Sequence, residues 1–241
     1  SLKKELVDIE SEYPALITPD SPSQRVAGES LAAFSKVTHE VQQWSLNDAF
    51  EDSEIRDFDT RVKRMLVSEL GHEVTPSYSC ELKIDGLHIV LTYEQGILVT
   101  AATRGDGQVG EDVTHNVRTI DSVPLKLKEP VNIVVEGEIW LSKNDLKRIN
   151  KERKQEGLAE YANPRNLAAG TIRQLDPKVA AARKLDTFIY DLSLGETHET
   201  QSSELGRLAE LGFKVNKNFS VCKNIEEVIK FWQDWHNKKD K

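Results

Sequence analysis

The chain has 241 residues, of which 38% are hydrophobic and 30% are charged, and its formal net charge is -8. This composition predicts a globular, cytoplasmic protein without a membrane anchor, and the acidic balance argues against nucleic-acid binding over the whole surface. The two cysteines, Cys80 and Cys222, lack the spacing of a zinc site or a disulfide framework, which fits a reducing compartment. We expect a monomer.

The first 43 residues predict a short helix followed by a turn-rich connector. Leu2, Leu6 and Ile9 fall on one helical face, Pro14 ends the helix, and residues 16–28 contain the turn-forming sequence TPDSPS. Because the chain begins without Met and within this helical pattern, we expect residues 1–43 to be the remnant of a small helical subdomain with its connector. Residues 44–241 then form the main domain.

A longer helix is predicted after residue 50. Asp52 or Ser53 is the expected N-cap, and the helix ends at Gly71. The stretch after it, residues 78–93, has two parts. Its second half alternates apolar and polar residues from Leu87 to Tyr93, which is typical of a half-buried strand.

Immediately before that strand lie Lys83, Asp85 and Gly86. A lysine in an apolar, strand-rich setting loses hydration, so its pKa falls and its amine becomes nucleophilic. An aspartate two residues away on an extended chain points to the same face and can orient the amine. A surface Lys–Asp pair at the end of a strand is the competing interpretation of a motif this short.

Residues 94–96 predict a hairpin turn that leads into a second strand at residues 97–103. The glycine-rich loop that follows contains Arg104, and its backbone amides could contact an anionic or ribose-bearing ligand. Residues 132–140 form a strand with two carboxylates, Glu136 and Glu138, around a glycine. Acids within an apolar run are unfavourable unless they bind something, so both are candidate contacts for a ribose or Mg²⁺. An edge strand with solvated acids is the alternative.

Ser142 is expected to cap a helix that reaches about Gln155, and its many lysines and arginines predict a solvated face. In the next helix-like segment Asn166 is a possible cap. Arg165 and Arg173 would lie within about 80° of each other around that helix, an arrangement that suits phosphate recognition. Surface salt bridges are the alternative. The prediction is completed by a strand at residues 185–192, a short strand at 213–215, two helices at 204–211 and 225–235, and a polar tail at 236–241.

Together and in this order, these motifs are specific: the chain resembles the adenylation domain of bacterial NAD-dependent DNA ligases. The segments that carry the resemblance are residues 16–22, 44–50, 80–86, 102–107, 110–120, 136–138, 163–166 and 175–177. The resemblance covers nearly the whole chain. It implies an α+β nucleotidyltransferase fold, built of antiparallel sheets with flanking helices, after a small helical remnant.

The resemblance also implies a mechanism. Lys83 attacks the α-phosphorus of NAD, forms lysyl-AMP and releases nicotinamide mononucleotide, with Mg²⁺ as metal cofactor. AMP then passes to the 5′-phosphate of nicked double-stranded DNA before sealing. The implied site residues are Lys83, Asp85, Arg165 and Arg173 for catalysis, and Ser45, Leu46, Glu81, Lys83, Arg104 and Glu138 for the cofactor; no protein ligand of the metal is implied.

Three departures from the family bear on these expectations. The upstream residues of the nicotinamide-mononucleotide site and two downstream lysine motifs are absent from the chain, and Glu136 stands where the family usually has arginine. We therefore expect a fragment that does not seal nicks alone. Two alternatives stay open: an ATP- or GTP-dependent lysyl-nucleotidyl transferase, and a nucleotide-binding module without turnover.

Overall fold

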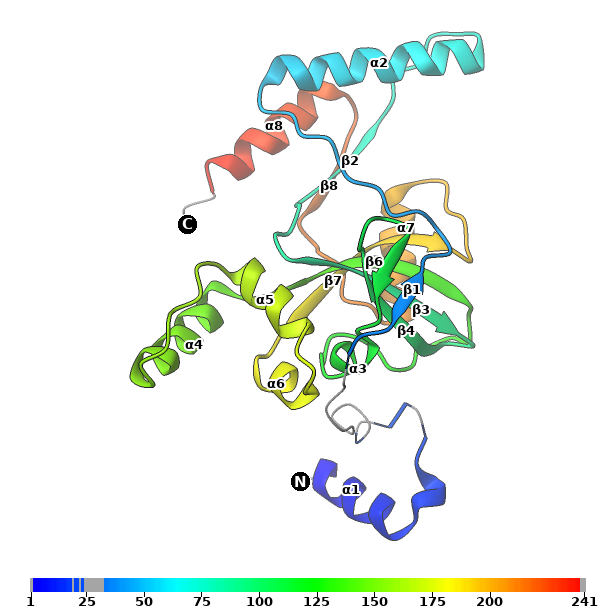
Figure 1. Cartoon of the computed structure of the whole chain (residues 1–241). Helices are drawn as coiled ribbons and strands as arrows, with labels where there is room; N and C mark the ends of the chain where they lie inside the picture. Colours follow the sequence, from blue (N-terminus) through cyan, green and yellow to red (C-terminus); the bar gives the residue numbers. More distant parts are fainter. Residues whose placement is uncertain (1, 19, 22, 24–32, 239–241) are drawn as a thin grey trace. The chain divides into compact units, whose positions relative to one another are not determined.

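The computed structural model describes residues 2–18, 20, 21, 23 and 33–238 (Figure 1). The chain divides into two compact units, and each is built from two separate segments. Unit 1 contains Ser1–Gln43 and Ile84–Val215, and unit 2 contains Trp44–Lys83 and Asn216–Lys241. Residues 19, 22 and 24–28 of the predicted connector, and residues 239–241 of the predicted polar tail, lie outside the described residues.

Unit 1 is organised around a four-stranded antiparallel sheet with the order β4-β3-β6-β7. The strands are β3 (Leu87–Glu94), β4 (Ile97–Thr103), β6 (Ile133–Trp140) and β7 (Asp186–Leu194). The turn between β3 and β4 has positive φ at Gln95 (48°) and Gly96 (74°), the geometry that closes a two-residue hairpin. The predicted hairpin is therefore confirmed.

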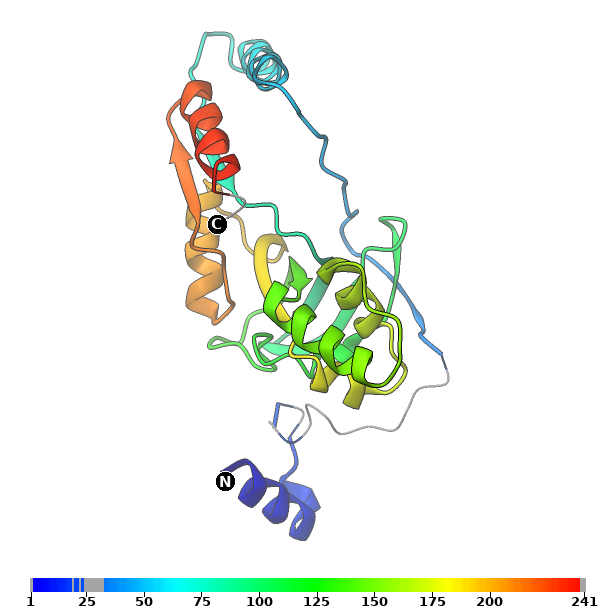
Figure 2. The same ribbon diagram turned by 90° about the vertical axis from the view of Figure 1, so that its left-hand side faces the viewer.

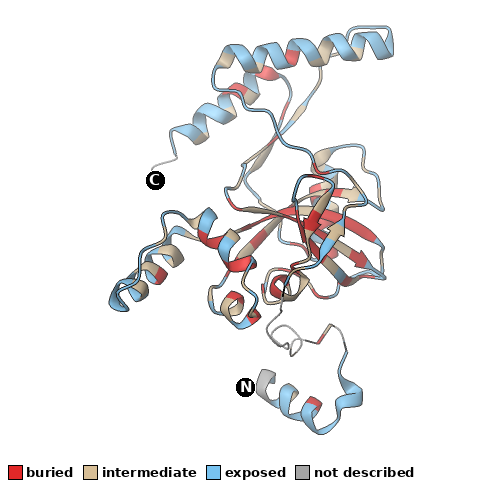
Figure 3. Cartoon of the chain, viewed as in Figure 1, coloured by how far each residue is buried: buried red, intermediate tan, exposed pale blue. Residues whose placement is uncertain are grey.

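The two faces of this sheet differ in polarity. His88 and Val90 of β3 lie opposite Glu138 and Glu136 of β6, so these side chains share one face because residues directly opposite in a sheet point the same way. The alternate residues of the strands form the core and are at most 1% exposed: Ile89, Leu91, Tyr93, Ile139 and Ile189. Figure 3 shows the buried residues concentrated on these strands.

Short helices pack around the sheet: α3 (Thr114–Val117), α4 (Lys143–Gln155), α5 (Pro164–Ile172), α6 (Pro177–Ala182) and α7 (Gln201–Leu211). Ser142 caps α4, as predicted. The prediction for α5 is wrong by one turn, because Asn163 is its N-cap and accepts from the backbone of Asn166. Pro164 then occupies the first turn, where a missing N–H does no harm.

The predicted strand at 213–215 is also wrong. This segment makes a single backbone hydrogen bond to the sheet, from the Ile189 amide to the Lys214 carbonyl, and the Lys214 side chain pairs with Asp186 of β7. The strand in that part of the chain is β8 (Phe219–Cys222). In unit 1 the short strands β1 (Lys36–Thr38) and β5 (Val109–Glu111) pair with each other. At the N-terminal end are α1 (Leu2–Glu12) and the 3₁₀ turn η1 (Pro14–Leu16).

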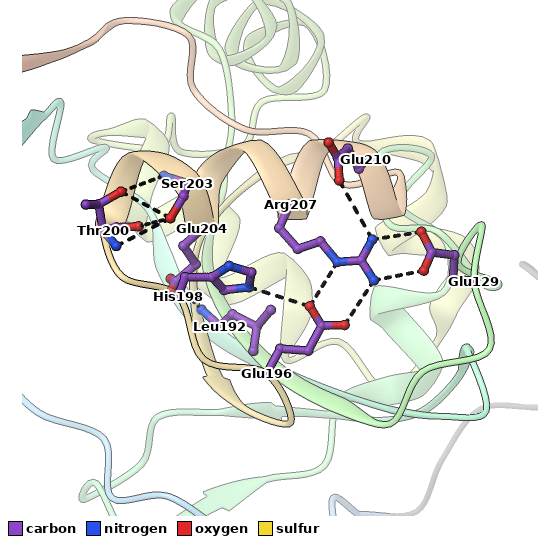
Figure 4. A network of polar contacts seen from close by, with 9 residues as sticks. All are labelled: Glu129, Leu192, Glu196, His198, Thr200, Ser203, Glu204, Arg207 and Glu210. Carbon is purple, nitrogen blue, oxygen red and sulfur yellow. Dashed lines mark hydrogen bonds and ion pairs between the residues drawn. The ribbon is translucent and has the colours of Figure 1, made fainter.

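Arg207 of α7 joins the loops at one end of the sheet (Figure 4). Its guanidinium donates to both oxygens of Glu129, at 2.7 and 2.9 Å, and to both oxygens of Glu196, at 2.9 and 3.0 Å. The two carboxylates raise the pKa of Arg207 above its usual value, and its charge holds the pKa of Glu129 and Glu196 below theirs. This network ties α7 to the segments before β6 and after β7.

Unit 2 pairs two helices with two strands. The helices are α2 (Asp52–Leu70) and α8 (Ile225–His236), and the antiparallel strands are β2 (Tyr78–Glu81) and β8. The predicted N-cap of α2 is wrong: Glu51 is the N-cap and forms a capping box with Glu54, one residue before the expected Asp52. The predicted end at Gly71 is confirmed. Among the described residues, no helix is long and apolar enough to cross a membrane.

Candidate active site

The Lys-x-Asp-Gly sequence forms the connection between β2 and β3. Lys83 ends the first segment of unit 2, and Ile84, Asp85 and Gly86 open the second segment of unit 1. Both Lys83 and Asp85 are exposed, so the expected loss of hydration at the lysine is wrong for this structure. Any desolvation of the amine has to come from a ligand that covers it.

Gly86 places the motif tightly against β6. Its backbone N–H donates to Oε1 of Glu138 at 3.0 Å, and Glu138 is only 7% exposed. A Cβ on residue 86 would lie 2.1 Å from the Ile139 carbonyl oxygen, so no other residue fits without displacing the strand. The contact fixes one oxygen of a buried carboxylate next to the motif.

Asp85 is held by a residue from a distant part of the sequence. Arg165, in the first turn of α5, donates from Nη1 to Oδ1 of Asp85 at 2.9 Å. The side chains are 52% and 75% exposed, so the pair adds little to stability. Its effect is to orient the Asp85 carboxylate and to bring a guanidinium beside the motif.

Arg173 has a different partner. It is the C-cap of α5, and its Nε lies 3.0 Å from Oε2 of Glu111 on β5. The two arginines therefore contact separate acids, Asp85 and Glu111, instead of converging on one. This agrees with the salt-bridge alternative for the ligand-free protein, and phosphate recognition by this pair stays a prediction.

Arg104 lies in the turn between β4 and β5, but the expected free amides of this loop are not available. The Gly107 N–H donates to the Arg104 carbonyl, and the Gln108 and Val109 N–H groups donate to Oδ1 of Asp106. These backbone bonds lower the pKa of Asp106. The loop amides thus stabilise the turn itself, which leaves the exposed Arg104 side chain as the group that could contact a ligand.

A cluster of polar side chains on the same sheet face was not predicted from the sequence. His88 Nε2 lies 2.9 Å from Oε1 of Gln43 and 3.6 Å from Oε2 of Glu136. Glu136 also accepts a 2.5 Å hydrogen bond from Ser193. Burial raises the pKa of Glu136, against the lowering effect of the Ser193 hydroxyl. The solvated-edge alternative for Glu136 is therefore wrong, because β6 is a central strand and this carboxylate is largely buried.

Tyr190 is another residue of this cluster that sequence reasoning missed, like Gln43 and Ser193. Its hydroxyl lies 2.8 Å from His88 Nδ1. Burial raises the pKa of Tyr190, as do the nearby charges of Glu138 and Glu136, whereas the charge of Arg104 lowers it. Tyr190, Glu138 and Arg104 are thus close enough to interact. The alternation of β3 offered a signal, since it places His88 on the polar face near the start of the strand.

The remaining candidates belong to unit 2. Glu81 ends β2, where it pairs with Phe219 of β8. Ser45 and Leu46 lie in the extended segment before α2, and Leu46 is 74% exposed. Their expected contacts with adenosine stay predictions. Strand β2 is braced within unit 2 by Tyr78, which donates to Oδ1 of Asp59 on α2 at 2.6 Å.

The described residues contain no group of three or more His, Cys, Asp or Glu side chains that could hold a metal ion. Mg²⁺ usually keeps several waters and is bound by one or two carboxylates together with substrate phosphates. The side chains of the described residues therefore do not form a metal cage by themselves, and no residue is assigned as a metal ligand.

Comparison with known proteins decides which family these features belong to. The sequence model of the NAD-dependent DNA ligase adenylation domain matches residues 31–241. The chain belongs to this family. A second model, the DNA ligase-like N-terminal NAD+-binding domain, matches residues 1–27. The two models together account for residues 1–27 and 31–241.

Curated DNA ligases resemble the chain along its whole length. The DNA ligase of Thermotoga petrophila is 49% identical over 240 residues, which cover 99% of this chain and 34% of the relative. The DNA ligase of Brevibacillus brevis is 48% identical over 240 residues, 99% of this chain and 35% of the relative. The chain thus spans about a third of the length of the curated relatives it matches.

Proposed function

We propose that this adenylation domain has the nucleotidyltransferase fold and transfers AMP from NAD to Lys83. The Nζ–P bond forms as the bond from the α-phosphorus to the bridging oxygen breaks. Nicotinamide mononucleotide leaves with that oxygen, and the amine releases a proton. The observation that carries the proposal is the contact of the Gly86 amide with Glu138, which places a buried carboxylate beside the Lys-x-Asp-Gly motif.

Three side chains of unit 1 have roles in this proposal. Glu138 accepts from a ribose hydroxyl, and the Gly86 N–H holds one of its oxygens in place. Arg104 contacts the ribose or the phosphate, because it is exposed and its charge acts on the same sheet face. Asp85 orients the amine of Lys83, and its pairing with Arg165 fixes the direction of its carboxylate.

In unit 2, Glu81 recognises the adenine amino group, and Ser45 and Leu46 line the adenosine site. These roles rest on the family resemblance of residues 44–50 and 80–86. Mg²⁺ assists through substrate phosphate oxygens, where it would offset the charge that develops during phosphoryl transfer. The proposed division places a helical remnant and connector in residues 1–43 and the adenylation domain in residues 44–241.

The later steps are proposed for the whole protein, because this chain is about a third of its relatives' length. AMP passes from Lys83 to the 5′-phosphate of nicked double-stranded DNA as the lysine–phosphorus bond breaks. The 3′-hydroxyl then displaces AMP. Arg165 and Arg173 serve these steps by exchanging Asp85 and Glu111 for phosphate oxygens, since guanidinium binds phosphate bidentately. The protein acts as a cytoplasmic monomer.

The test is the intact mass of the chain before and after incubation with NAD or ATP and Mg²⁺. We expect a gain of one AMP from NAD only. Lys83→Ala should abolish the gain, and Lys217→Ala, which removes an exposed lysine of unit 2, should retain it. A gain from ATP in preference to NAD would establish the nucleotidyl-transferase alternative. No gain from either nucleotide would favour a binding module.

A further inference from the structure

Helix α4 carries four exposed lysines: Lys143, Lys147, Lys151 and Lys154. We call them the α4 lysine stripe. In the described part of the chain, none of the four forms an ion pair with a carboxylate, whereas the other two cations of this helix do have partners. Arg148 pairs with Asp145 and Glu152, and Arg153 lies over the Tyr161 ring at 4.4 Å.

The stripe occupies one side of the helix. At 100° per residue the four positions fall within about 80° of one another. Ile149, the buried residue of α4, lies on the opposite side, about 200° from the middle of the stripe. The acids Asp145 and Glu152 lie outside the stripe, about 100° or more around the helix axis from the nearest stripe lysine. The lysines thus form a strip of single-sign charge that faces away from the protein.

The position of α4 connects this strip with the candidate active site. Helix α4 packs against α5, and α5 contacts β3 and β6 of the sheet (Figures 1 and 2). Arg165 of α5 pairs with Asp85, which is two residues from Lys83 in the sequence. Helix α5 therefore lies between the motif, which it contacts through Arg165, and α4, whose outer surface carries the stripe in a chain of net charge -8.

We propose that the α4 lysine stripe binds the phosphate backbone of duplex DNA beside the site of the reaction. The inference rests on the proposed function and adds a docking surface to it. The stripe is about 16 Å long, with neighbouring lysines about 5–6 Å apart along the helix axis. Each strand of a duplex offers one phosphate charge per about 3.4 Å of its axis, so four lysines can each meet a phosphate. Such contacts position DNA without reading its sequence.

The first arm of the test uses lysine acetylation read by mass spectrometry, with and without an unbroken 30-base-pair duplex at low salt. We expect the duplex to protect the four stripe lysines. Four other exposed lysines, in both units, serve as references and should stay reactive: Lys126, Lys128, Lys217 and Lys230. Equal protection of both sets would overturn the proposal. Protection of the stripe by polyglutamate but not by the duplex would overturn it in favour of an acidic protein.

The second arm measures how the affinity for the duplex depends on salt. Changing the four stripe lysines to Gln should reduce the slope of log K against log salt by about 3.6, because each phosphate contact contributes about 0.9. The matched variant, with the four reference lysines changed to Gln, has the same net charge and should change the slope by less than about 1. Equal slopes for the two variants, or no binding by the wild-type chain at low salt, would overturn the proposal.

The gain of AMP from NAD separates this inference from the proposed function. Both quadruple variants should gain one AMP at the wild-type rate, since the eight lysines are exposed and lie outside the proposed machinery. If the wild-type chain binds the duplex through the stripe but takes no AMP, the proposed chemistry fails and the docking surface stands. If AMP is gained and the stripe variant binds like the matched variant, the docking surface fails alone.

Discussion

Two groups of charged side chains at the sheet of unit 1 are built in opposite ways. Around Arg207, the guanidinium meets the carboxylates of Glu129 and Glu196 at hydrogen-bonding distance. On the polar sheet face, Glu136 and Glu138 lie on the same strand; Glu138 accepts from the Gly86 amide, and Glu136 contacts the Ser193 hydroxyl and His88. In the first group the arginine and carboxylate charges offset each other, whereas in the second group burial raises the pKa of Glu136.

The difference indicates which group serves structure and which serves chemistry. A carboxylate that faces an arginine has its pKa lowered, as in Glu196, and is favourable in the folded state. A carboxylate that is buried without such a partner has its pKa raised, as in Glu136. Its ionised form therefore lowers the stability of the folded state unless a ligand binds it. Strained or unfavourable charge of this kind is common at functional sites.

The largest effect is expected from Gly86→Ala. The added Cβ would lie 2.1 Å from the Ile139 carbonyl oxygen and 2.9 Å from Cγ of Glu138, which should lower the free energy of unfolding by about 3 kcal/mol. Gly206→Ala in α7 is the control, because no atom lies within 4 Å of its added Cβ; it should raise the free energy by about 1 kcal/mol. Urea denaturation measures the free energy of unfolding of both variants. Equal changes in the two would refute the close contact of Gly86 with β6.

Glu138→Gln should slow the gain of AMP about 100-fold, which corresponds to about 2.7 kcal/mol in the activation barrier. The amide keeps an oxygen for the Gly86 N–H but loses the charge that binds a ribose hydroxyl strongly. The melting temperature should change little. A time course of intact mass gives the rate, and Glu129→Gln, in the balanced group, should leave that rate unchanged.

Arg207→Met should lower the free energy of unfolding by about 1 kcal/mol at pH 7. The effect is small because the ion pairs of Arg207 are partly exposed and solvent screens them. The pKa values of Glu129 and Glu196 are lowered in the folded state. Their contribution is therefore present above the unfolded pKa of about 4.3 and is lost as the pH falls through the folded values. The difference between variant and wild type should shrink in acid. A constant difference from pH 7 to pH 3 would contradict the ionic origin.

Glu136→Gln should have the smallest effect and the opposite sign. Because burial raises the folded pKa of Glu136 above its ordinary 4.5, the folded state binds this proton more tightly than the unfolded state. Stability from this group is present at low pH and is lost as the pH rises through the folded value. The variant should be more stable than the wild-type chain at pH 7, and this difference should disappear at pH 4. Destabilisation at pH 7 would show that the carboxylate is needed for the fold.

The positions of the long elements could be predicted because their signals are local. The hairpin of β3 and β4 follows from alternation and a Gln-Gly turn, and α2 ends at Gly71 as expected. The short strands β1 and β5 were missed, because three residues carry too little periodicity and their pairing joins distant segments. The cap of α2 was misplaced for a related reason, since Glu51 acts as a cap only together with Glu54.

The sequence by itself determined the family, the motif residues and the nucleophile proposed for them, because these depend on residue identity and order. Only the tertiary structure decided that Asp85 meets Arg165 and that Gly86 meets Glu138. It also decided that His88, Gln43 and Tyr190 join Glu136 in one cluster. These contacts join residues 45 to 102 positions apart, and such pairings arise from sheet register and helix packing, which no local pattern encodes.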